Sequence, residues 1–371
     1  MDDDRLQKAR ETIGGVDREM AGLFVKRMEA ARQIAAYKQE RGLPIRDAAQ
    51  ERAVIERNLA FIGADELRSF YVRFIQDVMD ISRQYQRRLI EGMRVAYSGV
   101  EGAFAHIAAR RIFPEGRMIA CSDFQSAYEA VERGECEVCV LPVENSYAGE
   151  VGQVTDLMFN GGLHVTGMYA MPVTHNLLGL PGATLSGIRR VISHPQALSQ
   201  CAGAIRRLGL ESVQASNTAR AAQLVVQNGD PETAAIASLE TASLYGLQVL
   251  AQGINESGLN STRFAVFSRA ENKPAPAGAA GFLLLFTVNH EAGALARAVN
   301  VIGRYGFNMR ALRSRPMKDL PWRYYFFAEM EGDDRSDAGQ RMLRELAGHC
   351  NILKVAGRYA AEVSLGEVDE A

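Results

Sequence analysis

Polar side chains occupy faces of the N-terminal helical segment where apolar packing is expected. When residues are counted in steps of three and four along two long helical patterns, five polar residues fall on the faces predicted to point inward: Arg10, Arg27, Lys38, Ser82 and Gln86. A single long cation can reach the rim of a helix and stay in solvent. Five inward polar residues need partners, because an unpaired buried polar group is energetically costly. A small ligand with two negative charges would supply them.

Three further polar clusters stand at the ends of apolar runs in the middle of the chain. Residues 144–146 (Glu-Asn-Ser) and 193–196 (Ser-His-Pro-Gln) each follow a run, whereas residues 260–263 (Asn-Ser-Thr-Arg) precede one. Ligands bind outside the carboxyl ends of strands in open α/β sheets, so the first two clusters predict a pocket. The third can join it only if its run lies antiparallel to the others or crosses between two lobes. Each cluster could instead cap a helix or form a turn.

The composition limits the class of protein. The chain has 371 residues, of which 47% are hydrophobic and 23% charged, and its net charge is −2. This length exceeds one ordinary core and predicts three domains. The near-neutral charge gives no reason to expect a nucleic acid or membrane partner. The acidic start, MDDDRLQKAR, lacks a signal-peptide pattern and no run of about 18 apolar residues occurs, so we expect a cytoplasmic protein.

The five cysteines are few and odd in number, which is typical of a reducing compartment rather than of a disulfide framework. Cys136 and Cys139 form a C-x-x-C, so a redox or metal site has to be considered. The surrounding run, CEVCVLP, is typical of a half-buried strand in which cysteine acts as a small apolar residue. We therefore expect no metal site and no organic cofactor.

The pattern of the chain changes three times. Residues 1–92 carry helical periodicity with one break at RGLPIRD, which predicts an all-helical domain. Residues 93–270 alternate β-rich and helical stretches, which predicts an α/β domain with mainly parallel strands. Residues 271–281 read as a Pro/Gly/Ala linker. Residues 282–361 read strand, helix, strand, strand, helix, strand, the α+β order of a ferredoxin-like unit, and residues 362–371 are a tail.

The first helix is long for its domain. If residues 10–41 form one helix, it spans about 48 Å at 1.5 Å per residue. That exceeds the width of a globule of some 90 residues. We expect such a helix to pack against a second subunit, which predicts a homodimer or a higher homo-oligomer.

The helical domain resembles the all-helical chorismate mutases, whose dimers interlock long helices. The resemblance lies in RETIGGVD (residues 10–17), PIRDAAQE (residues 44–51), and the positions of Arg27, Lys38, Ser82 and Gln86. It implies that Arg27, together with Arg10 of the partner subunit, binds the two substrate carboxylates. Lys38 and Gln86 would donate to the ether oxygen. The residues implied around the ring hydroxyl are Asp47, Glu51 and Ser82.

One residue departs from that family's pattern. The family usually has D-x-x-R-E, whereas Asp47 and Glu51 here enclose Gln50 in place of the arginine that helps bind substrate. Losing one charged hydrogen bond costs about 1.5 to 3 kcal/mol. The sequence therefore predicts a weakened mutase, with Gln50 still a substrate contact.

The α/β domain resembles the prephenate dehydratases, which have a two-lobed fold similar to periplasmic binding proteins. Five stretches carry the resemblance in order: YSGVEGAFAHIAA, LPVENSYAG, VISHPQ, LYGLQVL and NSTRFAVFSR. It implies that Thr262 hydrogen-bonds the departing hydroxyl and that Asn145 and Gln196 hold a substrate carboxylate or hydroxyl. Arg263 would support the anionic end of the substrate or a loop. The remaining substrate-contact candidates are Glu144, Ser146, His194 and Phe264.

The first of these motifs also departs from its family. Where GPxGSFS is common, this chain has GVEGAFA, so Val100, Ala103 and Ala105 replace a proline and two hydroxyl residues. Those hydroxyls could have been ligands. The preference for prephenate over its amino analogue arogenate therefore stays open.

The C-terminal unit resembles the ACT domain that follows prephenate dehydratases. In that family GAL begins a helix and ESRP faces it to form an amino-acid site between subunits. Gly293, Ala294 and Leu295 match the first motif, and the second reads RSRP, Arg313-Ser314-Arg315-Pro316. Free backbone N–H groups at a helix start suit a carboxylate, which predicts phenylalanine as an effector. The alternative is a dimerising module without a ligand, because Arg313 replaces the acidic partner of the ammonium group.

Together these resemblances predict a bifunctional enzyme of phenylalanine biosynthesis. Its domains would be an intertwined all-α chorismate mutase, a two-lobed α/β prephenate dehydratase and an α+β ACT domain. It would convert chorismate to prephenate and prephenate to phenylpyruvate, with feedback by phenylalanine. One alternative is a dehydratase with a degenerate mutase. The other is a non-catalytic sensor of aromatic amino acids, because two-lobed and ACT domains often bind without reacting.

Overall fold

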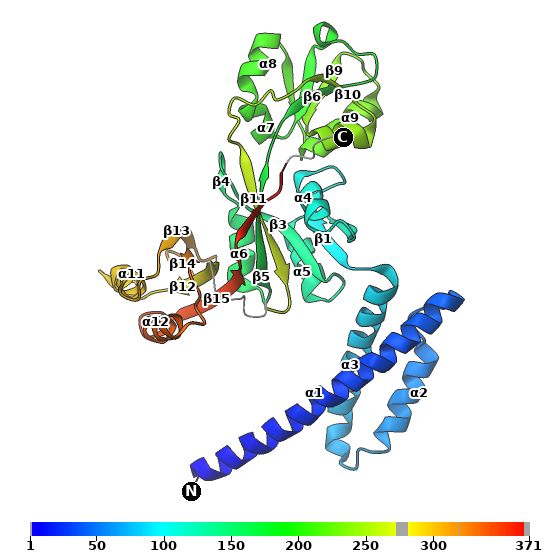
Figure 1. Cartoon of the computed structure of the whole chain (residues 1–371), viewed down its shortest axis with the longest axis vertical. Helices are drawn as coiled ribbons and strands as arrows, with labels where there is room; N and C mark the ends of the chain where they lie inside the picture. Colours follow the sequence, from blue (N-terminus) through cyan, green and yellow to red (C-terminus); the bar gives the residue numbers. More distant parts are fainter. Residues whose placement is uncertain (1, 272–280, 319, 367–371) are drawn as a thin grey trace. The chain divides into compact units, whose positions relative to one another are not determined.

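The computed structural model describes residues 2–271, 281–318 and 320–366 (Figure 1). The chain divides into two compact units, Met1–Arg94 and Val95–Ala371. Within the described residues, no helix combines the length and the apolar character needed to cross a membrane. The predicted linker at 271–281 lies outside the described residues, apart from its two ends.

The first unit is all-helical, as predicted. Its helices are α1 (Asp2–Arg41), α2 (Ala48–Leu59) and α3 (Asp65–Glu91). Gly42 follows α1 with φ 62°, a left-handed conformation that glycine adopts without strain. Asp47 begins α2, where its side chain accepts a hydrogen bond from the Gln50 backbone N–H at 3.0 Å. At 40 residues, α1 is about 60 Å long.

Helix α1 packs chiefly against α3, and it buries little of its own surface in doing so. The buried apolar residues are Ala31 and Ala35 on α1, and Ile75 and Met79 on α3. Most of the predicted apolar stripe of α1 lies in solvent in the single chain. The exposed members are Ile13, Val16, Met20, Leu23, Phe24 and Ile34.

The second unit contains a large sheet of eleven described strands, ordered β13-β14-β12-β15-β5-β11-β3-β1-β2, with β16 paired to β5 and β4 paired to β3. Its N-terminal strands are β1 (Arg94–Ser98), β2 (Arg117–Cys121), β3 (Val138–Asn145), β4 (Gly149–Glu150), β5 (His164–Pro172) and β11 (Ser261–Ser268). The helices of this lobe are α4 (Phe104–Ile112), α5 (Phe124–Glu132) and α6 (Gly152–Asn160).

A second sheet, ordered β10-β6-β9-β7-β8, forms the other lobe. Its strands are β6 (Asn176–Gly179), β7 (Arg190–Ser193), β8 (Glu211–Gln214), β9 (Thr233–Ala237) and β10 (Gln248–Ala251). Its helices are α7 (Pro195–Gln200), α8 (Ala202–Leu208), α9 (Thr218–Asn228), α10 (Leu239–Tyr245) and the 3-10 turn η1 (Leu185–Gly187). The chain enters this lobe after β5 and leaves it before β11 (Figure 1).

The prediction of mainly parallel strands is wrong. Strands β1 and β3 are parallel, as are β7, β8 and β9, but β11 is antiparallel to both β3 and β5. Strands β6 and β10 are also antiparallel to their neighbours. The reason is the double crossing, because a strand that returns from the other lobe enters the first sheet from the opposite end.

The C-terminal region has the predicted strand and helix order. It consists of β12 (Gly281–Thr287), α11 (Ala294–Arg304), β13 (Met309–Pro316), β14 (Tyr324–Glu331), α12 (Asp337–Ala347) and β15 (Ile352–Tyr359). Strand β15 pairs with β5 at Gly357 and Val165, so this region extends the large sheet. Residues expected to form a tail instead include β16 (Glu362–Ser364), which pairs with β5. The C-terminal region and the first lobe of the second unit therefore share one sheet.

Candidate active sites

The first site lies between α1 and α3 of the helical unit. Arg27 Nε donates a hydrogen bond to Ser82 Oγ at 3.2 Å, and Ser82 Oγ donates to the Val78 carbonyl at 2.9 Å. Gln86 follows one turn later, and both Ser82 and Gln86 are 7% exposed. Gln86 Oε1 has no hydrogen-bond partner among the described residues. The pair of helices therefore places a cation near a buried amide.

The other predicted mutase residues stand around this pair without forming one cluster with it. Lys38 Nζ donates to the Ile45 carbonyl in the connection to α2, and Glu51 forms an ion pair with Arg83 of α3. Asp47 and Gln50 are exposed, and Asp47 is engaged as the cap of α2. Arg10 is exposed on α1.

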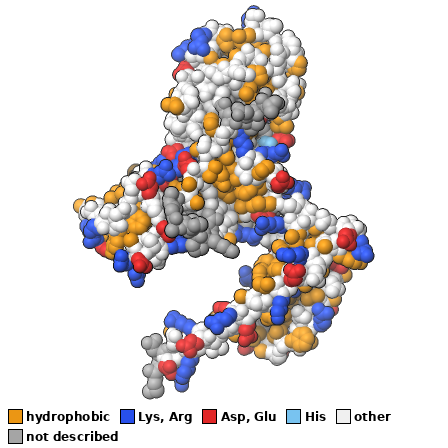
Figure 2. Space-filling model, in the orientation of Figure 1, with side chains coloured by type: hydrophobic (Ala, Val, Ile, Leu, Met, Phe, Trp, Pro, Cys, Tyr) orange, Lys and Arg blue, Asp and Glu red, His pale blue; other side chains and the backbone are white. Residues whose placement is uncertain are grey.

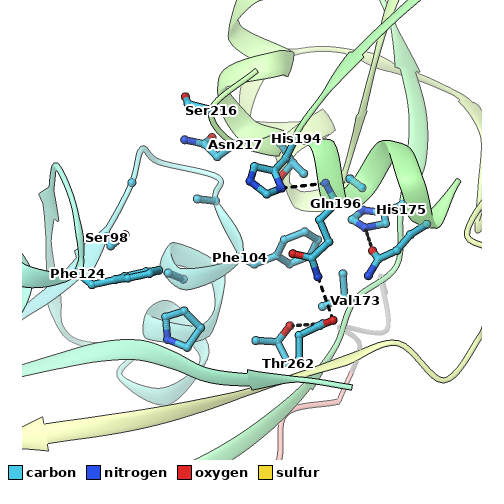
Figure 3. Close-up of a pocket in the computed structure, with 18 of the residues that line it drawn as sticks. Ser98, Phe104, Phe124, Val173, His175, His194, Gln196, Ser216, Asn217 and Thr262 are labelled. Atoms are coloured by element: carbon cyan, nitrogen blue, oxygen red, sulfur yellow. Dashed lines mark hydrogen bonds between the residues drawn. The ribbon is translucent and has the colours of Figure 1, made fainter. Parts of the chain in front are cut away.

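The second site is a cavity of about 390 Å³ between the two lobes of the second unit (Figure 3). Asn145, His194, Gln196 and Thr262 all line it. Three distant polar clusters of the sequence thus meet in one cavity. Ala103 and Ala105 line it as well, so the two missing hydroxyls of the first motif fall at this cavity.

Strand pairing brings Thr262 beside Asn145. Strand β11 runs antiparallel to β3, one of the two arrangements that the sequence allowed, with Thr262 opposite Asn145. Asn145 Nδ2 donates to Thr262 Oγ1 at 3.0 Å, while Asn145 Oδ1 accepts from Gln196 Nε2 at 3.0 Å (Figure 3). Asn145 is 8% exposed, so this amide is held almost out of water.

His194 and Gln196 reach the cavity from the start of α7. His194 Nδ1 accepts from the Gln196 backbone N–H at 3.2 Å and caps the helix, which was the structural alternative for this cluster. Its burial lowers the pKa of His194 below the usual value. His194 is therefore a neutral imidazole near pH 7 and an acceptor at its capping nitrogen.

Arg263 and Glu144 point away from the cavity, because neighbouring residues of a strand face opposite sides of the sheet. Arg263 bonds both oxygens of Glu329, at 2.8 and 2.6 Å, and also Glu362 at 2.6 Å and Glu144 at 3.2 Å. Arg313 forms an ion pair with Glu144. These residues join the dehydratase lobe to the C-terminal region.

The remaining two candidates of this lobe are structural in their contacts. Phe264 is 1% exposed within the sheet. Ser146 Oγ donates to the Leu259 carbonyl at 3.1 Å and accepts from the Ser261 backbone N–H at 2.9 Å. Ser146 therefore fixes the approach of the chain to β11.

The predicted effector residues are dispersed in the single chain. Gly293 caps α11 with φ 79°, Ala294 is buried and Leu295 half-buried. In the RSRP motif, Arg315 binds Asp156 of α6 at 2.9 and 3.1 Å, whereas Ser314 and Pro316 are exposed on β13. A cavity of about 430 Å³ in this region is lined by other residues, among them Asn289, His290, Tyr324 and Asn351.

Two polar residues behind Thr262, His175 and Gln200, were not identified from the sequence, which indicated Asn260 only as a member of the 260–263 cluster. His175, Gln200 and Asn260 are 2%, 4% and 6% exposed, and the first two line the cavity. Gln200 lies one helical turn after Gln196, and this spacing could have identified it. No local pattern distinguishes His175, which stands between the two lobes.

Comparison with known proteins finds relatives of both units. A family model described as chorismate mutase type II matches residues 9–87, and one described as prephenate dehydratase matches residues 95–272. The bifunctional chorismate mutase/prephenate dehydratase of Enterobacter agglomerans is 31% identical over 97% of this chain and 97% of its own length.

Two solved structures match the second unit. Prephenate dehydratase from Arthrobacter aurescens in complex with L-Phe is 26% identical, with a TM-score of 0.68, over 72% of this chain and 90% of its own. GqqA, described as a novel type of quorum quenching acylase, is 34% identical with a TM-score of 0.68, over 72% and 98%. The Enterobacter agglomerans match and the two family models show that this chain belongs to the bifunctional chorismate mutase/prephenate dehydratases, enzymes of phenylalanine biosynthesis with both activities.

Proposed function

We propose specific roles for the residues of both sites. Residues 1–92 would form the mutase, residues 93–270 the dehydratase and residues 282–361 the effector domain, with 271–281 as linker. The observation that carries the dehydratase assignment is the Thr262 hydroxyl held by Asn145 in a cavity between two lobes.

In the mutase site, Arg27 binds a carboxylate of chorismate and Gln86 donates to the ether oxygen. Support comes from the burial of Gln86, which is 7% exposed one turn after Ser82, the residue that Arg27 contacts. The rearrangement is unimolecular, so it needs a compressed conformer and donors aimed at the oxygen on which negative charge develops. Lys38 is the second donor to that oxygen, and Asp47, Glu51 and Ser82 surround the ring.

The mutase site is completed by a second copy of the chain. Support comes from the apolar side chains on the surface of the helical unit, several of them on α1 (Figure 2). A soluble monomer rarely exposes such a row, because apolar surface is stabilised by burial. In the dimer, Arg10 of the partner subunit binds the second carboxylate.

In the dehydratase site, the Thr262 hydroxyl donates a hydrogen bond to the hydroxyl of prephenate. That hydroxyl leaves with a proton as water, while the bond between the ring and its carboxylate breaks to release carbon dioxide. The electron pair of that bond completes the aromatic ring of phenylpyruvate. Threonine is a weak acid, so its contribution depends on preorganisation. Asn145 and Gln196 hold the substrate, and His194 is a neutral contact at the rim.

The contacts of Thr262 favour dehydration over acyl transfer, the activity named for GqqA. An acyl-transfer nucleophile needs an adjacent base to take its proton. Thr262 Oγ1 instead accepts a hydrogen from an amide, Asn145 Nδ2. This amide withdraws electron density from the hydroxyl oxygen and makes it a better donor.

Phenylalanine is the proposed effector, bound by the C-terminal region between two subunits. A relative with the same second unit has been solved with L-Phe bound. The start of α11 after Gly293 is a helix N-terminus, whose positive end suits the carboxylate of the amino acid. Arg313 is engaged by Glu144, so the ammonium partner must come from another residue than the one at position 313.

One experiment tests these assignments together. The purified protein is incubated with chorismate and separately with prephenate, while substrate loss and phenylpyruvate formation are followed. We expect both reactions, loss of only the first in Arg27→Ala, and loss of only the second in Thr262→Ala. Loss of both activities from either change would contradict two independent sites. A dehydratase rate that does not change with phenylalanine concentration, with no heat of phenylalanine binding, would exclude phenylalanine as an effector.

A further inference from the structure

Behind Thr262 lies a row of buried amides that ends in an imidazole. Thr262 Oγ1 is bonded to Asn145 at 3.0 Å, and Asn145 to Asn260 Oδ1 at 2.9 Å. Asn260 Nδ2 is 3.1 Å from Gln200 Oε1, which in turn is 2.8 Å from His175 Nε2. Figure 3 shows His175, Gln196 and Thr262 around the same cavity. The four residues behind Thr262 are each at most 8% exposed.

The backbone fixes the direction of the first amide. Asn145 Oδ1 accepts from the backbone N–H groups of Tyr147 at 3.1 Å and Ala148 at 3.0 Å. Asn145 Nδ2 donates to the backbone carbonyl of Ser261 at 3.1 Å. A flipped amide would set its NH2 group against two donors and its oxygen against an acceptor. Only one orientation of Asn145 is therefore compatible with its surroundings.

The amide orientation of Asn145 fixes the orientation of each following side chain in the row. Since Asn145 Nδ2 donates to Asn260, the facing atom of Asn260 is its oxygen. Asn260 Nδ2 then donates to the Val173 carbonyl at 3.3 Å and to Gln200 Oε1. Because Gln200 Oε1 is an acceptor, the His175 Nε2 that faces it carries the hydrogen. The donor atom of each contact in the row is thus defined, and the two hydrogens of Asn145 Nδ2 are shared among Asn260 Oδ1, the Ser261 carbonyl and Thr262 Oγ1.

Two consequences follow at the ends of the row. Thr262 Oγ1 accepts from Asn145, so its own hydrogen is free for a group in the cavity. His175 carries its hydrogen on Nε2, and its buried Nδ1 has no partner among the described residues. Burial lowers the pKa of His175, which keeps the ring neutral. The ring is also held by Phe104, with centroids 5.7 Å apart in an edge-to-face arrangement.

We propose that His175 is a positioning residue of the dehydratase reaction. As the neutral Nε2–H tautomer it anchors Gln200 and Asn260, and through them it holds Asn145 as the donor to Thr262. The Thr262 hydroxyl is thereby committed to donate to the departing hydroxyl. Without the His175 donor, Gln200 can rotate and Asn260 loses the acceptor that fixes it. A misplacement of about 1 Å in such an arrangement lowers a rate by about 10²-fold.

A matched pair of variants tests this role. A glutamine side chain at position 175 reaches as far as imidazole Nε2 and restores a donor to Gln200, whereas an asparagine reaches only as far as Nδ1. We expect His175→Gln to keep the dehydratase kcat within about 5-fold, and His175→Asn to lower kcat by about 10²-fold with KM for prephenate little changed. Denaturant unfolding of the second unit, which contains residue 175, reports whether each variant is folded.

The opposite ranking, with asparagine active and glutamine inactive, would place the function at Nδ1 and overturn the proposal. Equal kcat values for wild type and both variants would overturn it as well.

The tautomer can be measured in the unaltered enzyme, which does not depend on a variant folding. The full chain is labelled with 15N-histidine, and the His175 signals are assigned by their loss in His175→Gln or His175→Asn. We expect the two ring nitrogens of neutral His175 to show a protonated Nε2 and an unprotonated Nδ1. A neutral Nδ1–H tautomer, or an imidazolium at the assay pH, would overturn the proposal.

Discussion

Thr262 is oriented by an amide rather than by a base, and this difference sets its chemistry. Asn145 Nδ2 donates to Thr262 Oγ1, so the hydroxyl is directed outward as a donor. Such an arrangement serves a leaving group that departs as water, because the donor is already in place before charge develops. The same amide binds Gln196, which links the two sides of the cavity.

Thr262→Val keeps the shape of the side chain and removes the hydroxyl. We expect kcat for phenylpyruvate formation to fall by about 10²- to 10³-fold, with KM for prephenate changed only slightly, because the donor acts in the transition state. Thr262→Ser, which keeps the hydroxyl, should retain most of the rate. Steady-state kinetics with prephenate measures both. A valine variant as fast as the serine variant would exclude this role.

Gln50 is the position at which the mutase is predicted to be weak. We expect Gln50→Arg to raise kcat/KM for chorismate by roughly 10- to 100-fold, since one charged hydrogen bond contributes about 1.5 to 3 kcal/mol. The side chain is exposed, so the change should leave stability nearly unaltered. Gln50→Ala is the control and should bring no gain. Unchanged catalytic efficiency in the arginine variant would contradict this prediction.

At the scale of elements, the two faces of β11 make different contacts. One face presents Thr262 to the cavity, and the other presents Arg263 to Glu329 of β14 and Glu362 of β16. Glu329 is only 1% exposed, and burial alone would raise its pKa. Hydrogen bonds from Arg263 and Tyr359 and the charge of Arg263 instead hold the pKa of Glu329 below its usual value.

The charged cluster predicts an acid-sensitive contribution to stability. Because the folded pKa of Glu329 is lowered, its contribution is present above the unfolded value of about 4.3 and is lost as pH falls through the folded value. Glu329→Gln should reduce the free energy of unfolding of the second unit by about 3 kcal/mol at pH 7, since Arg263 loses its closest partner.

Denaturant unfolding between pH 3 and pH 7 measures this contribution. The difference between wild type and Glu329→Gln should shrink toward low pH. A difference that stays constant over the range would mean that Glu329 is not the group responsible. Glu331→Gln, on the same strand but exposed, is the matched control and should have little effect.

At the scale of the whole molecule, we propose that a second copy of the chain completes the helical unit. Helix α1 exposes a row of apolar residues, and Arg27 is the arginine proposed to bind one of the two substrate carboxylates. A two-fold dimer would cover the row and bring a second arginine, Arg10 of the partner subunit. A symmetric interface supplies both sites at once.

Mixing two inactive variants tests this shared site. Arg10→Ala and Arg27→Ala should each lose most mutase activity as homodimers. After the two are refolded together, a mixed dimer has one site with both arginines and one with neither, so about a quarter of the wild-type mutase activity should return. Dehydratase activity should stay constant throughout and serves as the control. No recovery despite mixed dimers, detected with a tag on one variant, would exclude the shared site.

The sequence determined the local structure and the chemical character of this protein. Periodicity of 3.6 residues predicts the helical unit, and alternating runs predict the strand and helix order of the C-terminal region, because these patterns depend on neighbouring residues. The motif around Thr262 and those around Asn145 and Gln196 identify the polar groups of the dehydratase cavity. The strand direction was misjudged, since periodicity within a strand does not record which way its neighbour runs, and the predicted tail contains strand β16.

Tertiary structure alone decided which of these polar groups meet. Thr262 pairs with Asn145 over 117 residues, and Arg263 beside it turns to Glu329 instead of the substrate. His175, Gln200 and Asn260 come from three separate segments and form one directed row only when the lobes fold together. Such contacts follow from strand pairing and from the crossings between lobes. No local pattern encodes them, because their cause is the packing of residues distant in sequence.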